Sequence, residues 1–133
     1  GIRYSDLKLL NAEDIQNNTI HIRMHKTSQG VSIPLSQKAN QLLPPSKSGK
    51  IFSIFCNKVT NRILKKIATK SGIDKKLTFH VARHTFATTS LTLGIPIEVI
   101  CKLLGHTNIK TTQIYAKVVD SVKEKEIEKW NNI

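Results

Sequence analysis

The first third of the chain alternates between apolar and polar positions, which is the spacing of half-buried β-strands. One run covers residues 19–25, a second follows Gly30, and a shorter strand is expected at 12–16, before an Asn-Asn turn. Their apolar positions are Ile20, Ile22 and Met24, then Val31, Ile33 and Leu35. The pattern predicts a three-stranded antiparallel meander, with Pro34 restricting the last strand to an edge because proline has no N–H to donate.

Most of the remaining chain has the spacing of amphipathic helices. Ser36 is a suitable N-cap for one of them, and a Gly94-Ile95-Pro96 break separates two others, the second of which stops at Gly105. We expect helices over 1–10, 36–43, the later part of 51–72, 78–93, 96–104 and 118–133. With the small sheet packed beside this helical bundle, the sequence predicts an α+β fold that is mainly helical.

The apolar positions also indicate which helix faces are buried. The expected inward sets are Val59, Ile63, Ile67 and Ala68; Phe79, Ala82, Phe86 and Leu93; Ile97, Ile100, Cys101 and Leu104; and Val118, Val119, Val122, Ile127 and Trp130. Cys56 and Cys101 are flanked by apolar residues and lack metal-ligand spacing. We interpret both as reduced core residues of a cytosolic protein.

The charge is strongly unbalanced. The 133 residues include 21 Lys+Arg and 9 Asp+Glu, for a formal net charge of +12, and residues 51–117 hold eleven of the basic side chains but two of the acidic ones. This excess destabilises a compact protein unless an anion offsets it, so it indicates a polyanionic partner, with nucleic acid the first candidate. No apolar run approaches the ~20 residues of a membrane span and no signal peptide is visible, so we expect a cytoplasmic protein without membrane contact.

Residues 78–116 hold the candidate chemistry. His80 and Arg83 lie three residues apart and project from nearly the same face of the expected helix. His106 follows the stop signal at Gly105, and Tyr115 comes nine residues later. The segments HVARHTFAT and LLGHTNIKTTQIYA resemble, in order and spacing, the C-terminal catalytic motif of the tyrosine recombinases, the phage-integrase family of site-specific DNA recombinases.

The resemblance extends to the start of the chain. Gly-Ile-Arg-x-Ser-Asp-Leu is similar to the first arginine motif of the family, so Arg3 would contact the scissile phosphate and Asp6 would support the site from behind. Lys26 matches the hairpin lysine of the family. His84 is outside the family set, and we expect it to pack or hydrogen-bond locally. The implied catalytic set is Arg3, Lys26, His80, Arg83, His106 and Tyr115.

These residue types suit covalent cleavage of a DNA strand. A tyrosine can become attached to the phosphate, but a free phenol has a pKa near ~10 and needs nearby cations and a base. Arginine stays protonated and binds two phosphate oxygens in a planar fork. The resemblance implies that Lys26 protonates the departing 5′ oxygen, that His80 assists proton transfer at the tyrosine or hydrogen-bonds the phosphate, and that His106 donates to a non-bridging oxygen. The expected product is a 3′-phosphotyrosyl enzyme with a free 5′ hydroxyl, formed without a metal ion or cofactor.

The partner implied by the resemblance is double-stranded DNA, with self-association in a tetrameric synapse and a nucleoid location when bound. The outer face of the helix within 51–72 is a candidate track for the phosphate backbone. The sequence has no starting methionine and does not include the segments that precede the first arginine motif in family members. We therefore expect one catalytic domain over 1–133, truncated at its N-terminus and weakly active or inactive alone. Residues 118–133 would dock in cis or on a neighbouring protomer. The expected backbone contacts are Lys58, Arg62, Lys65, Lys66 and Lys110.

Three other interpretations stay open. A type IB topoisomerase shares the tyrosine nucleophile, although that group typically has lysine where this chain has His80. A non-catalytic helix-turn-helix module over 80–104 would leave only Glu98 and Lys102 on its second helix to reach base edges. A metal site at His80 and His84 has helical spacing but no evident third ligand.

Overall fold

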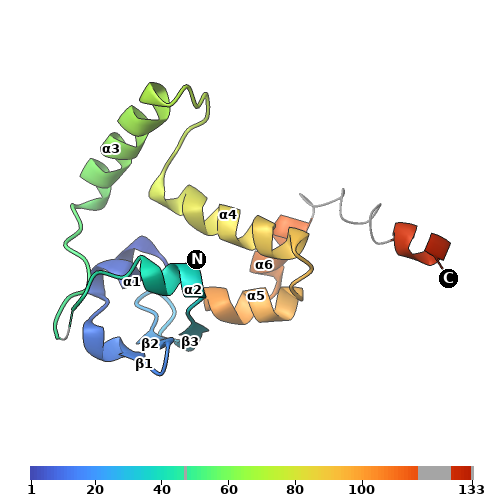
Figure 1. Ribbon diagram of the computed structural model, residues 1–133, viewed down its shortest axis with the longest axis horizontal. Helices are drawn as coiled ribbons and strands as arrows, with labels where there is room; N and C mark the ends of the chain where they lie inside the picture. Colours follow the sequence, from blue (N-terminus) through green and yellow to red (C-terminus); the bar gives the residue numbers. More distant parts are fainter. Residues whose placement is uncertain (47, 117–126, 133) are drawn as a thin grey trace.

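A short antiparallel sheet and a group of helices make up the computed structural model, which describes residues 1–46, 48–116 and 127–132 (Figure 1). The sheet contains β1 (Ile15–Gln16), β2 (Thr19–Arg23) and β3 (Gly30–Pro34), in the order β1-β2-β3. The helices are α1 (Tyr4–Leu9), η1 (Ala12–Asp14), α2 (Gln37–Gln41), α3 (Asn57–Lys70), α4 (Phe79–Thr92), α5 (Ile97–Leu104), α6 (Lys110–Ala116) and η2 (Lys129–Asn132). The predicted fold class, mainly helical α+β with a three-stranded sheet, is confirmed.

The meander follows from its alternating sequence. Ile20 pairs with Ile33 across β2 and β3, and Thr19 pairs with Pro34, so Pro34 does lie on an edge strand. The first predicted strand is mostly wrong, because residues 12–14 form the 3-10 turn η1. The Asp14 carboxylate accepts from the backbone N–H of Asn11, which stabilises a turn rather than an extended strand.

The helix ends follow local capping chemistry. The Ser36 hydroxyl accepts from the backbone N–H of Ala39 and caps α2, as its residue type predicts. The region from 36 to 43 is helical only to Gln41, and the first helix begins at Tyr4 rather than Gly1. The predicted helix at 96–104 ends at Leu104 as expected, but it begins at Ile97, because Pro96 is its N-cap and not its first helical residue. It buries Ile100, Cys101 and Leu104.

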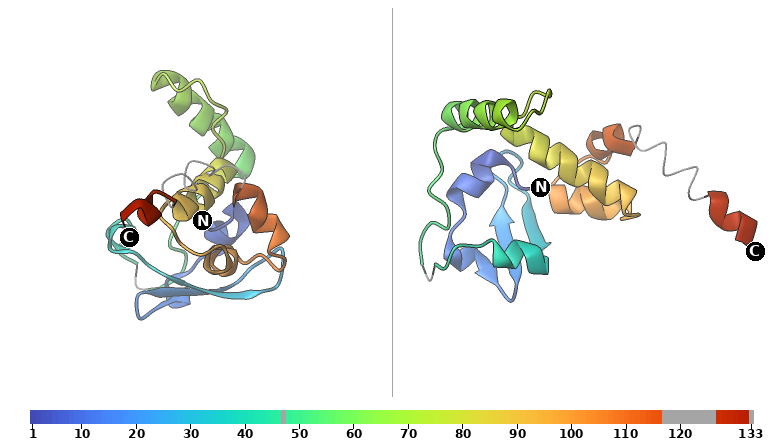
Figure 2. Two further views of the ribbon diagram at one scale, coloured as in Figure 1. Left: turned by 90° about the vertical axis from the view of Figure 1, so that its right-hand side faces the viewer. Right: turned by 45° about the horizontal axis from the view of Figure 1, so that its top comes forward.

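Two hydrophobic clusters stabilise the fold. One lies on the sheet and contains Leu10, Ile20 and Ile51. The other is formed where α4, α5 and α6 meet, which Figure 2 shows from two further sides. Its buried members are Ala87, Ile100, Leu104 and Tyr115. The second cluster therefore brings the two ends of the segment 78–116 together.

Gly105 connects the helical cluster to the sheet. It ends α5 with φ +61°, a left-handed conformation that glycine adopts without steric cost. A Cβ at this position would lie 3.0 Å from side-chain carbons of both Met24 and Val31. The left-handed turn at Gly105 is followed directly by His106, whose ring lies within hydrogen-bond distance of Arg83 on α4.

The predicted packing face of α4 is only partly correct. Phe86 is half-buried as expected, but Ala82 is exposed and Leu93 is 74% exposed. The buried positions are Arg83, Ala87 and Ser90, spaced four and three residues apart. The most buried face of α4 therefore includes a charged residue, which an apolar pattern cannot identify.

The helix α3 projects away from the sheet beside the start of α4 (Figures 1 and 2). Ala68 is buried, but Ile63 and Ile67, which we expected to face inward, are 37% and 48% exposed. Cys56, the N-cap of α3, is also exposed, so its interpretation as a core residue is wrong. Cys101 is buried as predicted.

The C-terminal prediction lies largely outside the described residues, because Val118, Val119 and Val122 belong to the undescribed part. Of the same expected stripe, Ile127 is 65% exposed and Trp130 is 72% exposed. The docking of 118–133 in cis or in trans therefore stays a prediction. Among the described helices, none has the length and apolar character to cross a membrane.

Candidate active site

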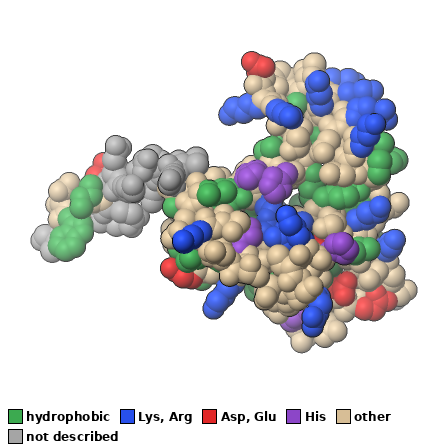
Figure 3. All heavy atoms as spheres, turned by 180° about the vertical axis from the view of Figure 1, so that it is seen from behind, with side chains coloured by type: hydrophobic (Ala, Val, Ile, Leu, Met, Phe, Trp, Pro, Cys, Tyr) green, Lys and Arg blue, Asp and Glu red, His purple; other side chains and the backbone are tan. Residues whose placement is uncertain are grey.

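Three of the predicted residues line one cleft. Arg3, His80 and Arg83 border a cavity of about 240 Å³ between the start of α1, α3 and the first turns of α4. Figure 3 shows His and Lys/Arg side chains together in the hollowed centre of one face of the molecule. Segments that are more than 75 residues apart in the sequence thus contribute to a single positively charged site.

Arg83 is the most constrained member of this site. It is 3% exposed, and its Nη1 donates to the Gly1 carbonyl at 2.7 Å. Its Nη2 donates to the Leu104 carbonyl at 2.6 Å and to Nε2 of His106 at 2.9 Å. Burial and the neighbouring charge of Arg3 lower the pKa of Arg83 to about 10. The guanidinium therefore stays protonated at neutral pH and keeps a fixed orientation.

Arg3 has a buried donor that no protein group satisfies. Among the described residues, its Nη1 atom has no hydrogen-bond acceptor although the atom is shielded from solvent. A buried guanidinium N–H without an acceptor is costly and needs an explanation. Because Arg3 lines the cleft, an anion bound there would supply the missing acceptor.

Asp6 connects α1 to the turn that carries Lys26. One carboxylate oxygen of Asp6 accepts from the backbone N–H of His25 at 2.8 Å, and Asp6 is 5% exposed. Lys26 follows His25 directly and is exposed, but it does not line the cleft of Arg3. The structure thus gives Asp6 a supporting contact and leaves Lys26 at the edge of the site.

His80 lies at the exposed end of the same group. Partial burial and the charge of His84 lower the pKa of His80 below its ordinary value. The charges of Arg83, Arg3 and Lys26 act in the same direction. The charge of Lys26 is therefore close enough to His80 to affect the pKa of its imidazole. A neutral imidazole at pH 7 can accept a proton, which a general base requires.

Tyr115 reaches this group through His84. The His84 ring lies edge-on to the His80 ring, with centroids 4.3 Å apart, and its centroid is 5.3 Å from that of Tyr115. Tyr115 is 6% exposed and belongs to the helical cluster, so it adjoins the cleft without lining it. The local packing expected of His84 is confirmed, but no pattern in the sequence indicates that it lies between two proposed catalytic residues.

His106 is held at both ring nitrogens. Its Nε2 accepts from Arg83, and its Nδ1 lies 2.8 Å from Oγ1 of the fully buried Thr112. Burial, followed by the charges of Arg83 and Arg3, lowers the pKa of His106 to about 4. Sequence reasoning overlooked Thr112 because a buried threonine has no motif signal. It also overlooked the separate helix α6 that carries Thr112 and Tyr115.

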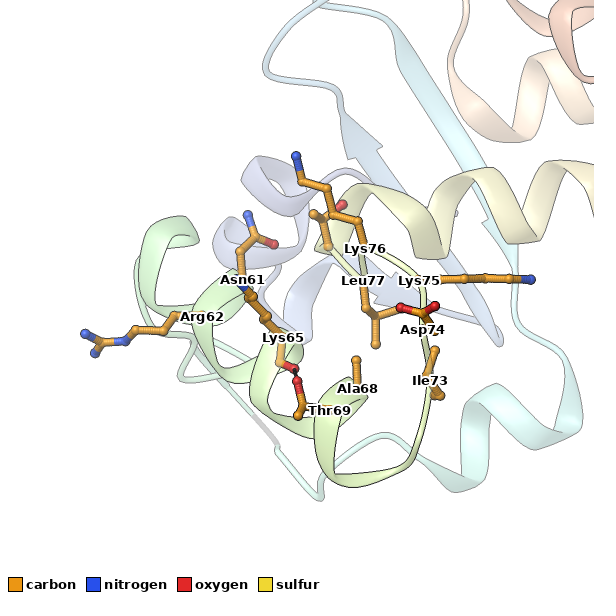
Figure 4. A pocket seen from close by; sticks show the side chains of 11 residues that line it. Asn61, Arg62, Lys65, Ala68, Thr69, Ile73, Asp74, Lys75, Lys76 and Leu77 are labelled. Atoms are coloured by element: carbon orange, nitrogen blue, oxygen red, sulfur yellow. Dashed lines mark hydrogen bonds between the residues drawn. The ribbon is translucent and has the colours of Figure 1, made fainter.

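The candidate DNA-backbone residues are all exposed. Lys58, Arg62, Lys65 and Lys66 lie on α3, and Lys110 begins α6. A cavity of about 630 Å³ lies beside α3, but its floor includes the apolar Ala68, Ile73 and Leu77. In Figure 4 the charged ends of Arg62 and Lys75 point in opposite directions, away from the hollow. This cavity therefore lacks the converging donors of a phosphate site, and basic charge lies around it on the surface.

The proposed metal site gains no support from the geometry. Although the His80 and His84 rings are in contact, the described part of the chain has no group of three His, Cys, Asp or Glu residues placed to hold a metal ion.

Comparison with known proteins agrees with the family resemblance of the sequence. The model of the phage integrase family matches residues 1–121. The tyrosine recombinase XerA of Saccharolobus solfataricus is 36% identical over 126 residues, covering 90% of this chain and 42% of the relative. A tyrosine recombinase of Pseudothermotoga lettingae is 34% identical over 136 residues, covering 92% and 47%.

Two solved structures are similar in fold. The crystal structure of XerA recombinase has a TM-score of 0.78 at 27% identity, covering 96% of this chain and 53% of that protein. The catalytic domain of bacteriophage HP1 integrase has a TM-score of 0.70 at 26% identity, covering 95% and 73%. The chain thus spans less than half the length of the two curated relatives. With 121 of its 133 residues matched by the family model, the chain belongs to the phage integrase family.

Proposed function

We propose that this chain is the catalytic part of a site-specific DNA recombinase or integrase, which cleaves and rejoins DNA strands through a 3′-phosphotyrosyl intermediate. The observation that carries the proposal is the cleft shared by Arg3, His80 and Arg83, with an unsatisfied buried N–H on Arg3. A phosphodiester has the charge and the acceptors that such a site needs. The names of the relatives, all tyrosine recombinases, support the same reaction.

The proposed reaction assigns one step to each group. The Tyr115 oxygen forms a bond to phosphorus while the bond from phosphorus to the 5′ oxygen breaks. The phenolic proton passes to a base, for which His80 is suited by its lowered pKa. Lys26 supplies a proton to the departing 5′ oxygen. Arg3 and Arg83 offset the charge that accumulates on the non-bridging oxygens, and His106 donates a hydrogen bond to one of these oxygens.

Rejoining is the same step in reverse. A 5′ hydroxyl from another strand attacks the phosphotyrosyl linkage and releases the Tyr115 phenol. Tyr115 lies in the helical cluster, and the phenol must therefore approach the cleft when DNA binds. Catalytic groups often reach their working distances only in the complex with substrate.

Double-stranded DNA is the proposed substrate and partner. The net charge of +12 favours binding to the polyanionic DNA backbone. The exposed basic residues of α3 would contact phosphates on either side of the cleaved bond. Exchange between two duplexes requires more than one active subunit, so we propose that the protein assembles as a tetramer on DNA. The nucleoid is then where the bound protein would be found.

A type IB topoisomerase is the second candidate, because it uses the same tyrosine chemistry without exchanging partners. His80 and the named relatives favour recombination over this alternative. The discriminating result is the joining of strands from two different DNA molecules. Relaxation of supercoiled DNA without such joining would support the topoisomerase.

A covalent-capture experiment tests the proposal even though the target sequence is unidentified. Duplexes with randomised sequence and a nick would be incubated with the 133-residue chain and with the longest natural chain that contains it. When a strand is cleaved beside the nick, the short fragment that carries the 5′ hydroxyl diffuses away. Rejoining then has no hydroxyl to use, and the covalent intermediate accumulates. We expect DNA linked to the Tyr115 peptide in wild type and none in Tyr115→Phe. Adducts that persist in Tyr115→Phe, or a complete lack of adducts in both wild-type chains, would contradict the proposal.

A further inference from the structure

Thr112 is the hydrogen-bond partner of the inner ring nitrogen of His106. It has no exposed surface, and its Oγ1 lies 2.8 Å from His106 Nδ1. The hydrogen bond joins the first turn of α6 to the residue that follows the C-cap of α5. Because Tyr115 lies one turn further along α6, Thr112 also connects His106 to the helix of the proposed nucleophile.

The neighbouring charge determines which ring nitrogen carries the hydrogen. A guanidinium can only donate, so the 2.9 Å contact from Arg83 Nη2 requires an unprotonated Nε2 on His106. The hydrogen of the neutral ring then lies on Nδ1 and points to Thr112. Without DNA, His106 is therefore a donor to threonine and an acceptor from arginine.

The proposed reaction needs the opposite arrangement. To donate to a non-bridging phosphate oxygen, the outer nitrogen Nε2 must carry a hydrogen. A phosphate in the cleft also competes for the Arg83 N–H that now points to His106. Once Nε2 is protonated, Nδ1 of a neutral ring becomes an acceptor and needs a donor.

A hydroxyl group can serve both states. The Thr112 oxygen accepts from Nδ1–H when DNA is absent, and its hydrogen can rotate to donate to a bare Nδ1. In the change, Nε2 gains one proton from water and Nδ1 releases one, so the net charge of the ring is unchanged. Asparagine or a backbone carbonyl at this position could not exchange the two roles with a single atom.

We propose that Thr112 is a positioning residue that holds His106 in both neutral tautomers and so allows the ring to change from an acceptor for Arg83 to a donor for phosphate. The proposal rests on the proposed function for the identity of the anion. The His106 ring can then donate to a phosphate while it remains uncharged before the phosphate binds.

The first test reads the tautomer of His106 by nitrogen NMR of histidine-labelled chain, with and without inorganic phosphate. We expect a hydrogen on Nδ1 in the free protein and on Nε2 with phosphate, in wild type and in Thr112→Ser. In Thr112→Val, which keeps the side-chain shape, the phosphate-dependent change should be lost. A ring that keeps its hydrogen on Nδ1 in phosphate, or that becomes doubly protonated, would overturn the proposal.

The second test separates positioning from folding and from binding. Thr112→Val leaves a part-buried ring nitrogen without its partner, so the variant should slow covalent capture by about fivefold to a hundredfold, with DNA affinity unchanged. Thr112→Ser should restore the rate, and Thr111→Val, an exposed neighbour on α6, should have no effect. Equal loss in the serine and valine variants would refute the role of the hydroxyl. If wild type forms no adduct, the proposed function fails, while the tautomer measurement still decides the role of Thr112.

Discussion

The ring of His84 lies between those of His80 and Tyr115, edge-on to both, with centroid distances of 4.3 Å and 5.3 Å. His84 precedes Tyr115 by 31 positions in the sequence. The contact brings the first helix of the catalytic motif against α6, the last one. It also makes the charge of His80 sensitive to a residue outside the family set.

Replacing His84 with phenylalanine should raise the pKa of His80. The substitution keeps an aromatic ring in contact with Tyr115 but removes the positive charge that opposes protonation of His80. Burial would still hold the pKa below its ordinary value. Proton NMR titration of the imidazole signals measures the change. The control is His21→Phe, because His21 lies on β2 with Ser32 as its partner. A pKa of His80 that falls or stays constant in His84→Phe would contradict this prediction.

Replacing Gly105 with alanine should destabilise the fold more than replacing Gly94. Both have positive φ, so alanine costs about 1–2 kcal/mol at each from backbone strain. At Gly105 the new Cβ also lies 3.0 Å from Met24 and Val31, whereas at Gly94 it meets no atom within 4 Å. Overpacking adds about 1–3 kcal/mol at Gly105. Urea unfolding of the two variants gives the difference, and equal free energies of unfolding would show that the sheet yields to the extra methyl group.

The free energy of unfolding should increase as the pH is raised from about 4 to the ordinary histidine pKa, and His106 should contribute to this increase. The folded pKa is lowered to about 4, so the unfolded chain binds more protons across this interval. The contribution is fully present above the unfolded pKa and is lost as the pH falls through the folded value. His106→Asn should flatten this part of the stability profile in denaturant unfolding. An unchanged slope in His106→Asn would contradict this prediction.

Neutralising Lys65 on α3 should weaken DNA binding to the same degree for every sequence. A contact to phosphate releases counterions and has no base information. Lys65→Gln should therefore lower the steepness of log affinity against log salt by about 0.9. Lys38→Gln on α2 is the matched control, since it removes the same charge from a helix beside the sheet. An unchanged salt slope in Lys65→Gln would exclude Lys65 from the backbone contacts.

Local sequence patterns were sufficient to predict those elements whose conformation depends on residues that are neighbours in the chain. The alternation of 19–25 and 31–35 predicted the meander, and the Gly105 signal predicted the end of α5. Such features depend on backbone geometry and on capping within a few residues. The family motif, together with the excess of positive charge, was likewise readable from sequence alone.

Only tertiary structure decided which groups meet. The sequence determined that Arg3, His80, Arg83, His106 and Tyr115 are present at family spacing. The contact of Arg83 with His106 depends on how α4 packs against the end of α5, and its contact with Gly1 depends on how the start of the chain packs against α4. The same packing buries Thr112 on His106 and inserts His84 beside Tyr115. Apart from the His106–Thr112 pair, which is six residues apart, these contacts span 23 to 82 residues of sequence. They arise from the shape of the packed core, for which a linear pattern has no signal. The apolar face of α3 is another case in which the linear pattern was not sufficient. The amphipathic sequence indicates a face that could be buried, but it does not show whether another element covers that face, and Ile63 and Ile67 are exposed.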